Sequence, residues 1–540
     1  MASLRLPWSA ADRRRFSAGG GGVVAWGGRP VFARASAAGG RAAAPRPGRL
    51  VDAVRARLAV PGLVMIAVSV LLTITIGLLG PSPMVPALGG PGWQPPYWLD
   101  ARPDPYAVLV LAAAALVIGG VGLLAALAAG PRPGLRARPL VLLGCLAAGV
   151  LAFLPPSGSG DHLNYAVYGR MVTLGLSPYT HGADDLPGDP IADAVERPWR
   201  EEPSVYGPVA TALQALASWI GGDSLRLTIF VLAVFNAAAF VVTALLIDRF
   251  TRDDPARRLR AALLWAANPL LHYHLVAGMH ADTLAIACMV AALLARARPV
   301  ASGVLLGLGV ATKLNAGLVA LGPAWELRRR PGRLAVMAAG ALAVVVVGYA
   351  VVGPEAIAPV TTTSKAISHA SFWKLVQGWL WALVGTGRAY RGEIQVGALV
   401  VLVLVAWALL RLASRRSAAR QGPGASGGLE APVVAAALVV AYLFATPYIL
   451  PWYDGLAFGM LALVGASAVD GFMVAHLLVL SLAYLPARVD GQPPGVEWLS
   501  GVLRPQIAWA LLALTVLLVV WAWRAGGPVR RPRASAAPPP

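Results

Sequence analysis

Residues 140–165 read LVLLGCLAAGVLAFLPPSGSGDHLNY, an apolar run that ends in a Pro/Ser/Gly turn and then reaches an acid. An apolar run of this length is typical of a helix within a bilayer, so Asp161 follows at the edge of the hydrocarbon. Ionisable groups near membrane spans are costly, which makes them candidates for function. We therefore interpret Asp161 as a catalytic group. The alternative is a purely structural role, in which its side chain caps the following helix.

The rest of the chain extends this pattern. Of its 540 residues, 57% are hydrophobic and 13% are charged. Backbone groups in lipid must be hydrogen-bonded within the protein, and the segments are too long and too uniformly apolar for barrel strands. The sequence thus predicts an all-α polytopic membrane protein with about 12–14 transmembrane helices. The spans are expected at 58–80, 106–129, 139–155, 226–247, 261–275, 281–296, 333–353, 394–413, 431–447, 455–469, 471–487 and 506–524.

The distribution of charge predicts the orientation. The net charge is +20, but arginines gather in short loops and tails, as in cytoplasmic flanks of membrane spans. This argues against a nucleic-acid partner. The charge distribution predicts that both termini lie inside the cell. It predicts that the following loops lie outside: 81–104, 156–204, 353–393, 446–454 and 488–504. Residues 1–57 and 525–540 are expected to be disordered basic tails around a catalytic domain at 58–524.

Several motifs fall on the predicted outer face. After Asp161, residues 165, 168 and 172 recur at helical spacing and predict an amphipathic helix. Residues 205–220 form a short apolar segment. Residues 300–325 are apolar but are interrupted at Thr312-Lys313-Leu314-Asn315, which predicts a broken helical hairpin beside a cavity.

A histidine group lies at a turn between two predicted spans. His272, His274, His280 and Asp282 are metal-ligand types, but their spacing matches no zinc signature. Hydrogen bonding to a sugar or phosphate at the mouth of a cavity is the favoured interpretation.

Lysines and aromatic residues add a third feature. The only lysines are Lys313, Lys365 and Lys374, the last two in the loop that contains His369. A lysine ammonium suits phosphate, although chance clustering is the alternative. Trp452 and Tyr453 are typical of an interfacial belt or of a sugar site.

Together these motifs resemble the GT-C membrane glycosyltransferases, and within them the actinobacterial polyprenol-phosphomannose-dependent α-1,6-mannosyltransferases. The resemblance rests on DHLNY at 161–165, YGR at 168–170, GLSPY at 175–179, YGP at 206–208, NP at 268–269 and GMH at 278–280.

The resemblance implies a GT-C fold whose large first extracytoplasmic loop carries the catalytic group. It implies transfer of mannose from polyprenyl-phosphate mannose to a lipid-anchored mannan, with inversion, at the outer face of a bacterial plasma membrane. Asp161 is the expected general base. No cofactor is expected, because the neighbour of Asp161 is His162 rather than a second acid. The expected substrate-binding residues are His162, Tyr165, Arg170, Tyr179, Tyr206, His274, His280, Asp282, Lys313, Lys365, His369, Lys374, Trp452 and Tyr453.

Two alternatives stay open. One is a GT-C transferase for another polyprenyl-phosphate sugar. The other is a polytopic transporter or lipid flippase, because broken helices and polar residues also suit transport.

Overall fold

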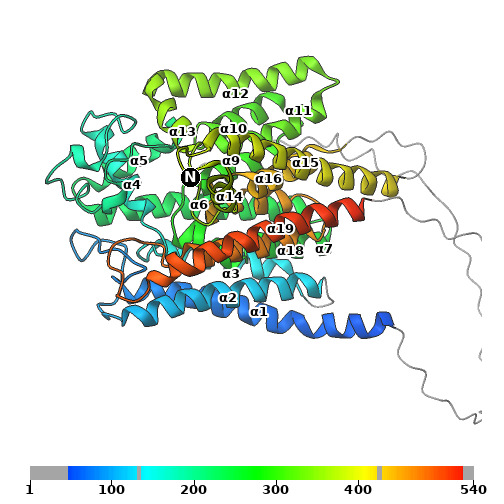
Figure 1. Cartoon of the computed structure of the whole chain (residues 1–540), viewed down its shortest axis with the longest axis horizontal. Coiled ribbons are helices and arrows are strands. Elements are labelled where there is room, and N and C mark those ends of the chain that lie inside the picture. The colour runs from blue at the N-terminus through cyan, green and yellow to red at the C-terminus, as the bar shows by residue number, and fades with distance from the viewer. Residues whose placement is uncertain (1–46, 131–134, 422–428, 527–540) are drawn as a thin grey trace, which may run out of the picture. The chain divides into compact units, whose positions relative to one another are not determined.

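The computed structural model describes residues 47–130, 135–421 and 429–526, and these residues are helices joined by turns and loops (Figure 1). The predicted tails lie almost entirely outside the described residues. Within the N-terminal one, helix α1 already begins at Pro47, before the predicted start of the first span at residue 58. The described helices belong to one unit, residues 51–540.

The principal helices follow the order of the predicted spans. Their bounds are α1 Pro47–Leu79, α2 Pro105–Ala129, α3 Ala137–Ala152, α4 Asp161–Thr173, α5 Pro208–Gly221, α6 Leu225–Thr251, α7 Pro255–Leu264, α9 Asp282–Leu294, α10 Pro299–Val310, α11 Leu321–Leu327, α12 Pro331–Val352, α13 Ala358–Thr363, α14 Trp373–Val384, α15 Arg391–Gln421, α16 Ala431–Ala445, α17 Asp454–Leu461, α18 Val469–Tyr484 and α19 Arg504–Ala525. Short helical turns at Leu314–Ala320, Pro451–Tyr453 and Leu499–Leu503 connect some of them.

Among these described helices, six are long and apolar enough to cross a membrane: Arg57–Leu79, Pro105–Ala129, Leu225–Thr251, Pro331–Val352, Arg391–Ala419 and Leu499–Ala525. Five shorter apolar helices accompany them: Ala137–Ala152, Asp282–Leu294, Pro299–Val310, Ala431–Ala445 and Val469–Tyr484. The prediction of an all-α polytopic membrane protein is confirmed.

Two predicted spans, 455–469 and 261–275, are not continuous helices. In the former, α17 ends at Leu461 and the chain turns until α18 begins at Val469. The latter breaks around Asn268-Pro269. Helix α7 ends at Leu264, and the chain resumes as a short turn, α8 Pro269–Leu271, and a π-helical turn at His272–Ala277. Pro269 lacks a backbone N–H, and a residue that precedes proline is biased away from helical geometry. The side chain of Asn268 instead accepts from the N–H groups of Leu270 and Leu271, so it caps a new turn.

The broken hairpin between 300 and 325 is confirmed. Helix α10 ends at Val310, a non-helical Lys313 follows, and the chain continues as a 3₁₀ turn and then α11. The break lies beside the start of α5, because the N–H of Gly207 donates to Thr312 O and the N–H of Val209 donates to Ala311 O. A Cβ on Gly207 would collide with the carbonyl of Ala311, so this approach requires glycine.

The predicted helix after Asp161 is confirmed as α4, which packs on α5 (Figure 1). A Cβ on Gly169 would collide with the carbonyl of Gln214, so the two helices meet backbone to backbone. Leu163, Met171 and Ile191 are buried in a cluster that belongs to this region, separate from the larger cluster among the long helices.

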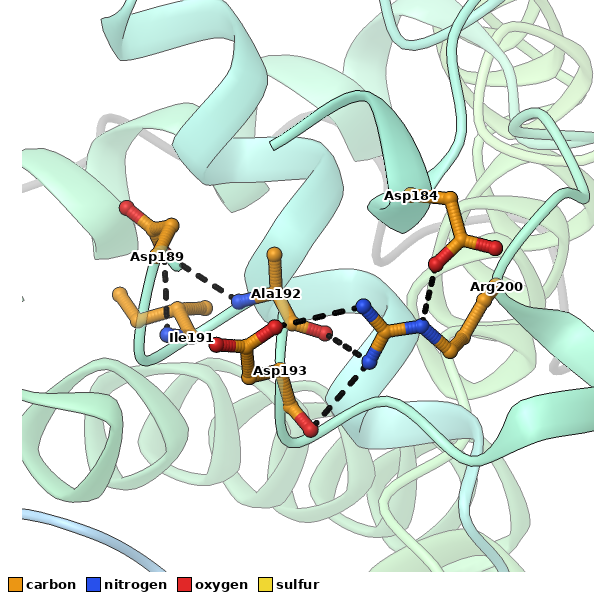
Figure 2. Close-up of polar contacts among 6 residues, drawn as sticks. All are labelled: Asp184, Asp189, Ile191, Ala192, Asp193 and Arg200. Atoms are coloured by element: carbon orange, nitrogen blue, oxygen red, sulfur yellow. Dashed lines mark hydrogen bonds and ion pairs between the residues drawn. The ribbon is translucent and has the colours of Figure 1, made fainter. Parts of the chain in front are cut away.

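The charged part of the 156–204 loop folds around Arg200, as Figure 2 shows. The guanidinium of Arg200 pairs with Asp184 and Asp193 and also donates to the carbonyl of Ala192. Asp189 accepts from the N–H groups of Ile191 and Ala192, so it closes the adjacent turn. Because these contacts involve half-exposed acids, each adds little stability, but together they give the loop a defined conformation.

Candidate active site

A cavity of about 550 Å³ lies where segments that are distant in sequence meet. Its walls come from residues 161–168, 199–206, 362–370, 448–453 and 480–504, with Lys313 between them. The orientation predicted from charge puts nearly all of these segments on one side of the membrane. The structure therefore brings together loops that the topology assigns to a common face.

Asp161 is the first residue of α4 and lines this cavity. Gly160 occupies the N-cap position and the side chain of Asp161 makes no cap hydrogen bond, so the capping interpretation is wrong. The carboxylate is 27% exposed, and its Oδ2 lies 3.4 Å from Nδ1 of His280. The carboxylate of Asp161 thus contacts the buried His280 and is also open to the cavity.

The environment of Asp161 keeps its carboxylate ionised. Burial raises the pKa of Asp161, but contact with His280 and the charges of His280 and Lys313 outweigh burial and leave this pKa below its usual value. His162 itself is fully buried, and burial together with the charge of Arg488 lowers its pKa to about 3. His162 is therefore a neutral side chain at physiological pH, and it lies behind the cavity wall rather than on it.

His280 is also fully buried, and its imidazole stacks on the indole of Trp452 with ring centroids 3.6 Å apart. The stacking fixes the plane of the imidazole that faces Asp161. Trp452 lines the cavity, so the indole separates His280 from the open space. Together, His280 and Trp452 support the carboxylate as a rigid unit.

Lys313 lines the cavity beside aromatic rings. Its ammonium lies 2.7 Å from both carboxylate oxygens of Asp282 and 4.1 Å from the centre of the Tyr453 ring. It is 5.7 Å from the Tyr206 ring, and the hydroxyl of Tyr206 is 2.9 Å from that of Tyr165. Lys313 is thus charge-balanced by Asp282, which lies behind the cavity lining.

Five other residues in the expected set lie away from the cavity lining. Arg170 pairs with Asp189 and Asp223, and the hydroxyls of Tyr179 and Thr211 are 2.8 Å apart. The imidazole of His274 is hydrogen-bonded to the hydroxyl of Ser481, and the ammonium of Lys374 donates to the side chain of Gln377. Lys365 is exposed.

The histidine group is dispersed over different partners. The nitrogens of His272 face the carbonyls of Asn268 and Gly144, whereas Asp282 pairs with Lys313. Within the part of the chain that the structure describes, no group of three or more His, Cys, Asp or Glu side chains converges as a metal site.

Sequence reasoning missed several polar residues that line the cavity. They are Asn164, Glu202, Arg391, Tyr484, Arg488 and Arg504. Arg391 and Arg504 are the first residues of two long apolar helices, a position that resembles an ordinary membrane flank. Glu202 follows other acids in a polar loop, so its sequence context carries no signal.

Two further cavities, of about 270 and 1050 Å³, both include the segment between α17 and α18. The smaller one lies against α15 and α16, and the larger one lies against α2, α7 and the start of α16. The larger one contains Arg260, whose guanidinium pairs with Asp470 and whose side chain is 9% exposed. Because this pair is buried and matched, it ties α7 to α18 and offers no free reactive group.

Comparison with known proteins adds an independent observation. A family model described as alpha-(1->6)-mannopyranosyltransferase, N-terminal domain, matches residues 62–329. The chain is similar to this family over just under half of its length. The match includes Asp161, Tyr206, His280, Asp282 and Lys313. The walls formed by residues 362–370, 448–453 and 480–504 lie beyond it.

Curated relatives carry the same family name. The chain is 29% identical over 170 residues to alpha-(1->6)-mannopyranosyltransferase A of Corynebacterium glutamicum, which covers 31% of this chain and 34% of that protein. It is 27% identical over 172 residues to alpha-(1->6)-mannopyranosyltransferase B of the same organism, covering 32% and 26%. A probable alpha-(1->6)-mannopyranosyltransferase of Mycolicibacterium smegmatis is 32% identical over 145 residues, covering 26% of each chain. The matched region thus spans about a third or less of these relatives.

Proposed function

We propose that the protein transfers mannose from polyprenyl-phosphate mannose to a lipid-anchored mannan and forms an α-(1→6) linkage with inversion. Similarity to the mannopyranosyltransferase family supports mannosyl transfer, and the apolar helices suit a lipid-linked donor. The observation that carries the proposal is Asp161, a partly exposed carboxylate on the wall of a 550 Å³ cavity inside the family-matched segment.

The geometry suits a general base. The primary hydroxyl of the acceptor attacks the anomeric carbon, Asp161 Oδ takes the hydroxyl proton, and the bond from carbon to the phosphate oxygen breaks. The polyprenyl phosphate leaves with the electron pair. Asp161 must be ionised before it can accept a proton, and its lowered pKa supplies that state. His280, 3.4 Å from Oδ2, helps to keep Asp161 ionised until the proton is transferred.

The aromatic rings suit a sugar. Trp452, Tyr453 and Tyr206 face the cavity, and flat rings pack against the C–H faces of hexoses. Lys313 fixes two of these rings by contact with their faces. We infer that the mannosyl residues lie against this wall, with the active site on the extracytoplasmic side of the plasma membrane and both termini in the cytoplasm.

A direct assay tests the proposal. Membranes that contain the full chain are incubated with polyprenyl-phosphate-[¹⁴C]mannose and a synthetic α-1,6-dimannoside, and the linkage of the product is determined. Wild-type membranes are expected to form a new α-(1→6) linkage. Asp161→Asn is expected to insert normally and to lose about 10²–10⁴-fold in rate. Near-wild-type transfer by Asp161→Asn rejects the base assignment, and movement of the lipid across vesicles without transfer favours a flippase.

A further inference from the structure

The cavity lining includes basic side chains that the mechanism above does not use. Arg391, Arg504 and His369 all line it. Arg391 begins α15 and Arg504 begins α19, whereas His369 lies in the segment between α13 and α14. These residues come from three separate parts of the chain, and the fold directs them to the same space.

The two arginines lack carboxylate partners. The guanidinium of Arg504 donates to the carbonyls of Ala483 and Leu485, and no acid among the described residues pairs with it. Arg391 is exposed, and the described part of the chain provides it with no ion pair either. Glu393, two residues further along α15, pairs with Arg388 instead.

The other cations at the cavity, Lys313 and Arg488, differ from Arg391 and Arg504 because each is paired with a carboxylate. Lys313 lies against Asp282, and Arg488 bonds to buried Glu196 with Nε 2.6 Å from Oε1. A cation that is already paired gains less from a new anion, because the anion must displace or share the existing partner. Among the described residues that line the cavity, Arg391 and Arg504 therefore carry the positive charge that no carboxylate compensates.

Neighbouring titratable groups report the same positive potential. Burial lowers the pKa of His369, and the charges of Lys374 and Arg504 lower it further. Burial also lowers the pKa of Lys374, with an added contribution from Arg391. Each of these groups is repelled by another cation, so an anion placed among them relieves repulsion as well as making new hydrogen bonds.

Helix geometry adds to the attraction. Helix α15 has 31 residues and begins at Arg391, which lines the cavity. Arg504 differs, because the helical turn Leu499–Leu503 runs into α19 without a break, so only α15 offers a helix N-terminus here. The N-terminus of a long helix carries a partial positive charge and free N–H groups, which favour phosphate. Arginine at such a position adds planar donors that match phosphate oxygens.

We propose that Arg391, Arg504 and His369 form the subsite that binds the phosphate group of a lipid-linked substrate. The identification of that lipid as the mannose donor rests on the proposed function. Asp161 lines the same cavity as these three residues. Inversion needs the base and the leaving group on opposite sides of the anomeric carbon, so a sugar bound between Asp161 and this subsite meets that requirement.

Binding measurements on the full-length protein in nanodiscs test the subsite without requiring transfer. The probe is a polyprenyl monophosphate without sugar, compared with the uncharged polyprenol. Arg391→Gln and Arg504→Gln are each expected to weaken monophosphate binding by about tenfold or more, with polyprenol binding unchanged. Arg388→Gln is the matched control, because it removes the same charge three residues from Arg391 at a paired and exposed position.

Other anions that could occupy the same subsite are tested in separate experiments. Inorganic phosphate and phosphatidylglycerol are each added as competitors, and the lipid monophosphate is expected to bind more tightly than both. Arg504→Lys guards against loss of folding, because it keeps the charge; it is expected to bind better than Arg504→Gln. Unchanged monophosphate binding in Arg391→Gln and Arg504→Gln overturns the proposal, as does equal binding of phosphatidylglycerol. Normal phosphate binding without mannosyl transfer rejects the proposed function and leaves this subsite standing.

Discussion

The imidazole of His280 lies flat on the indole of Trp452, with the ring planes 12° apart, and its Nδ1 faces the carboxylate of Asp161 at 3.4 Å. The stacking fixes the plane of the imidazole, so its Nδ1 stays directed at the carboxylate. The two contacts connect the 448–453 wall of the cavity to the acid through one buried ring. The protonation state of Asp161 therefore depends on a residue that does not line the cavity.

Removal of His280 is expected to change the pH dependence of transfer. The pKa of Asp161 is below its usual value, so the wild-type carboxylate stays ionised at a pH where an ordinary aspartate begins to be protonated. In His280→Ala the effect of burial is no longer outweighed, the pKa of Asp161 rises, and activity falls off at higher pH. The loss in kcat/KM at neutral pH is expected to be about tenfold or more.

A pH–rate profile checks this expectation. His181→Ala is the control, because His181 lies in the same loop but outside the cavity, beside Ser177 and Thr180. An acid limb at the same pH in wild type and His280→Ala contradicts the coupling.

The pair formed by Lys313 and Asp282 is expected to govern stability more than rate. Their side chains are 11% and 7% exposed, so removal of one partner leaves a buried charge without compensation. Lys313→Met is expected to cost about 3–5 kcal/mol of unfolding free energy. The double change Lys313→Met with Asp282→Leu is expected to regain much of that loss. Thermal unfolding in detergent measures both, and additive losses in the double variant contradict the pairing argument.

A methyl group at Gly207 is expected to displace Tyr206. The added Cβ meets the carbonyl of Ala311, and backbone hydrogen bonds hold both sides of that contact. Gly207→Ala should therefore lower the unfolding midpoint and the affinity for acceptor sugar together. Gly149→Ala is the matched control, because Gly149 lies in α3 with no atom near its Cβ position. An unchanged acceptor KM in Gly207→Ala shows that Tyr206 keeps its place.

The fold class could be predicted because its determinants are local. Apolar runs specify the helices, and the interruption at Thr312-Lys313 specifies the broken hairpin. The break at Asn268-Pro269 was missed, because the surrounding run is apolar enough to suggest one span. There the proline and the capping side chain outweigh hydropathy.

The site could be predicted only in part. Asp161, Tyr206, Lys313 and Trp452 are conspicuous in sequence, and all of them line the cavity. Arg391 and Arg504 were missed because an arginine at the start of an apolar helix also serves as a membrane flank. What sets them apart is the lack of a carboxylate partner within the described residues, and that property depends on tertiary contacts.

The two hydrogen bonds between residues 207–209 and 311–312 have a kinetic consequence. They join the end of the large loop to the interrupted hairpin, so this side of the cavity moves as one body. Entry and exit of a bulky glycan then require displacement of the opposite walls, at 362–370 or 448–453. We expect product release, rather than bond formation, to respond to substitutions in those two segments, both of which lie after the family-matched residues.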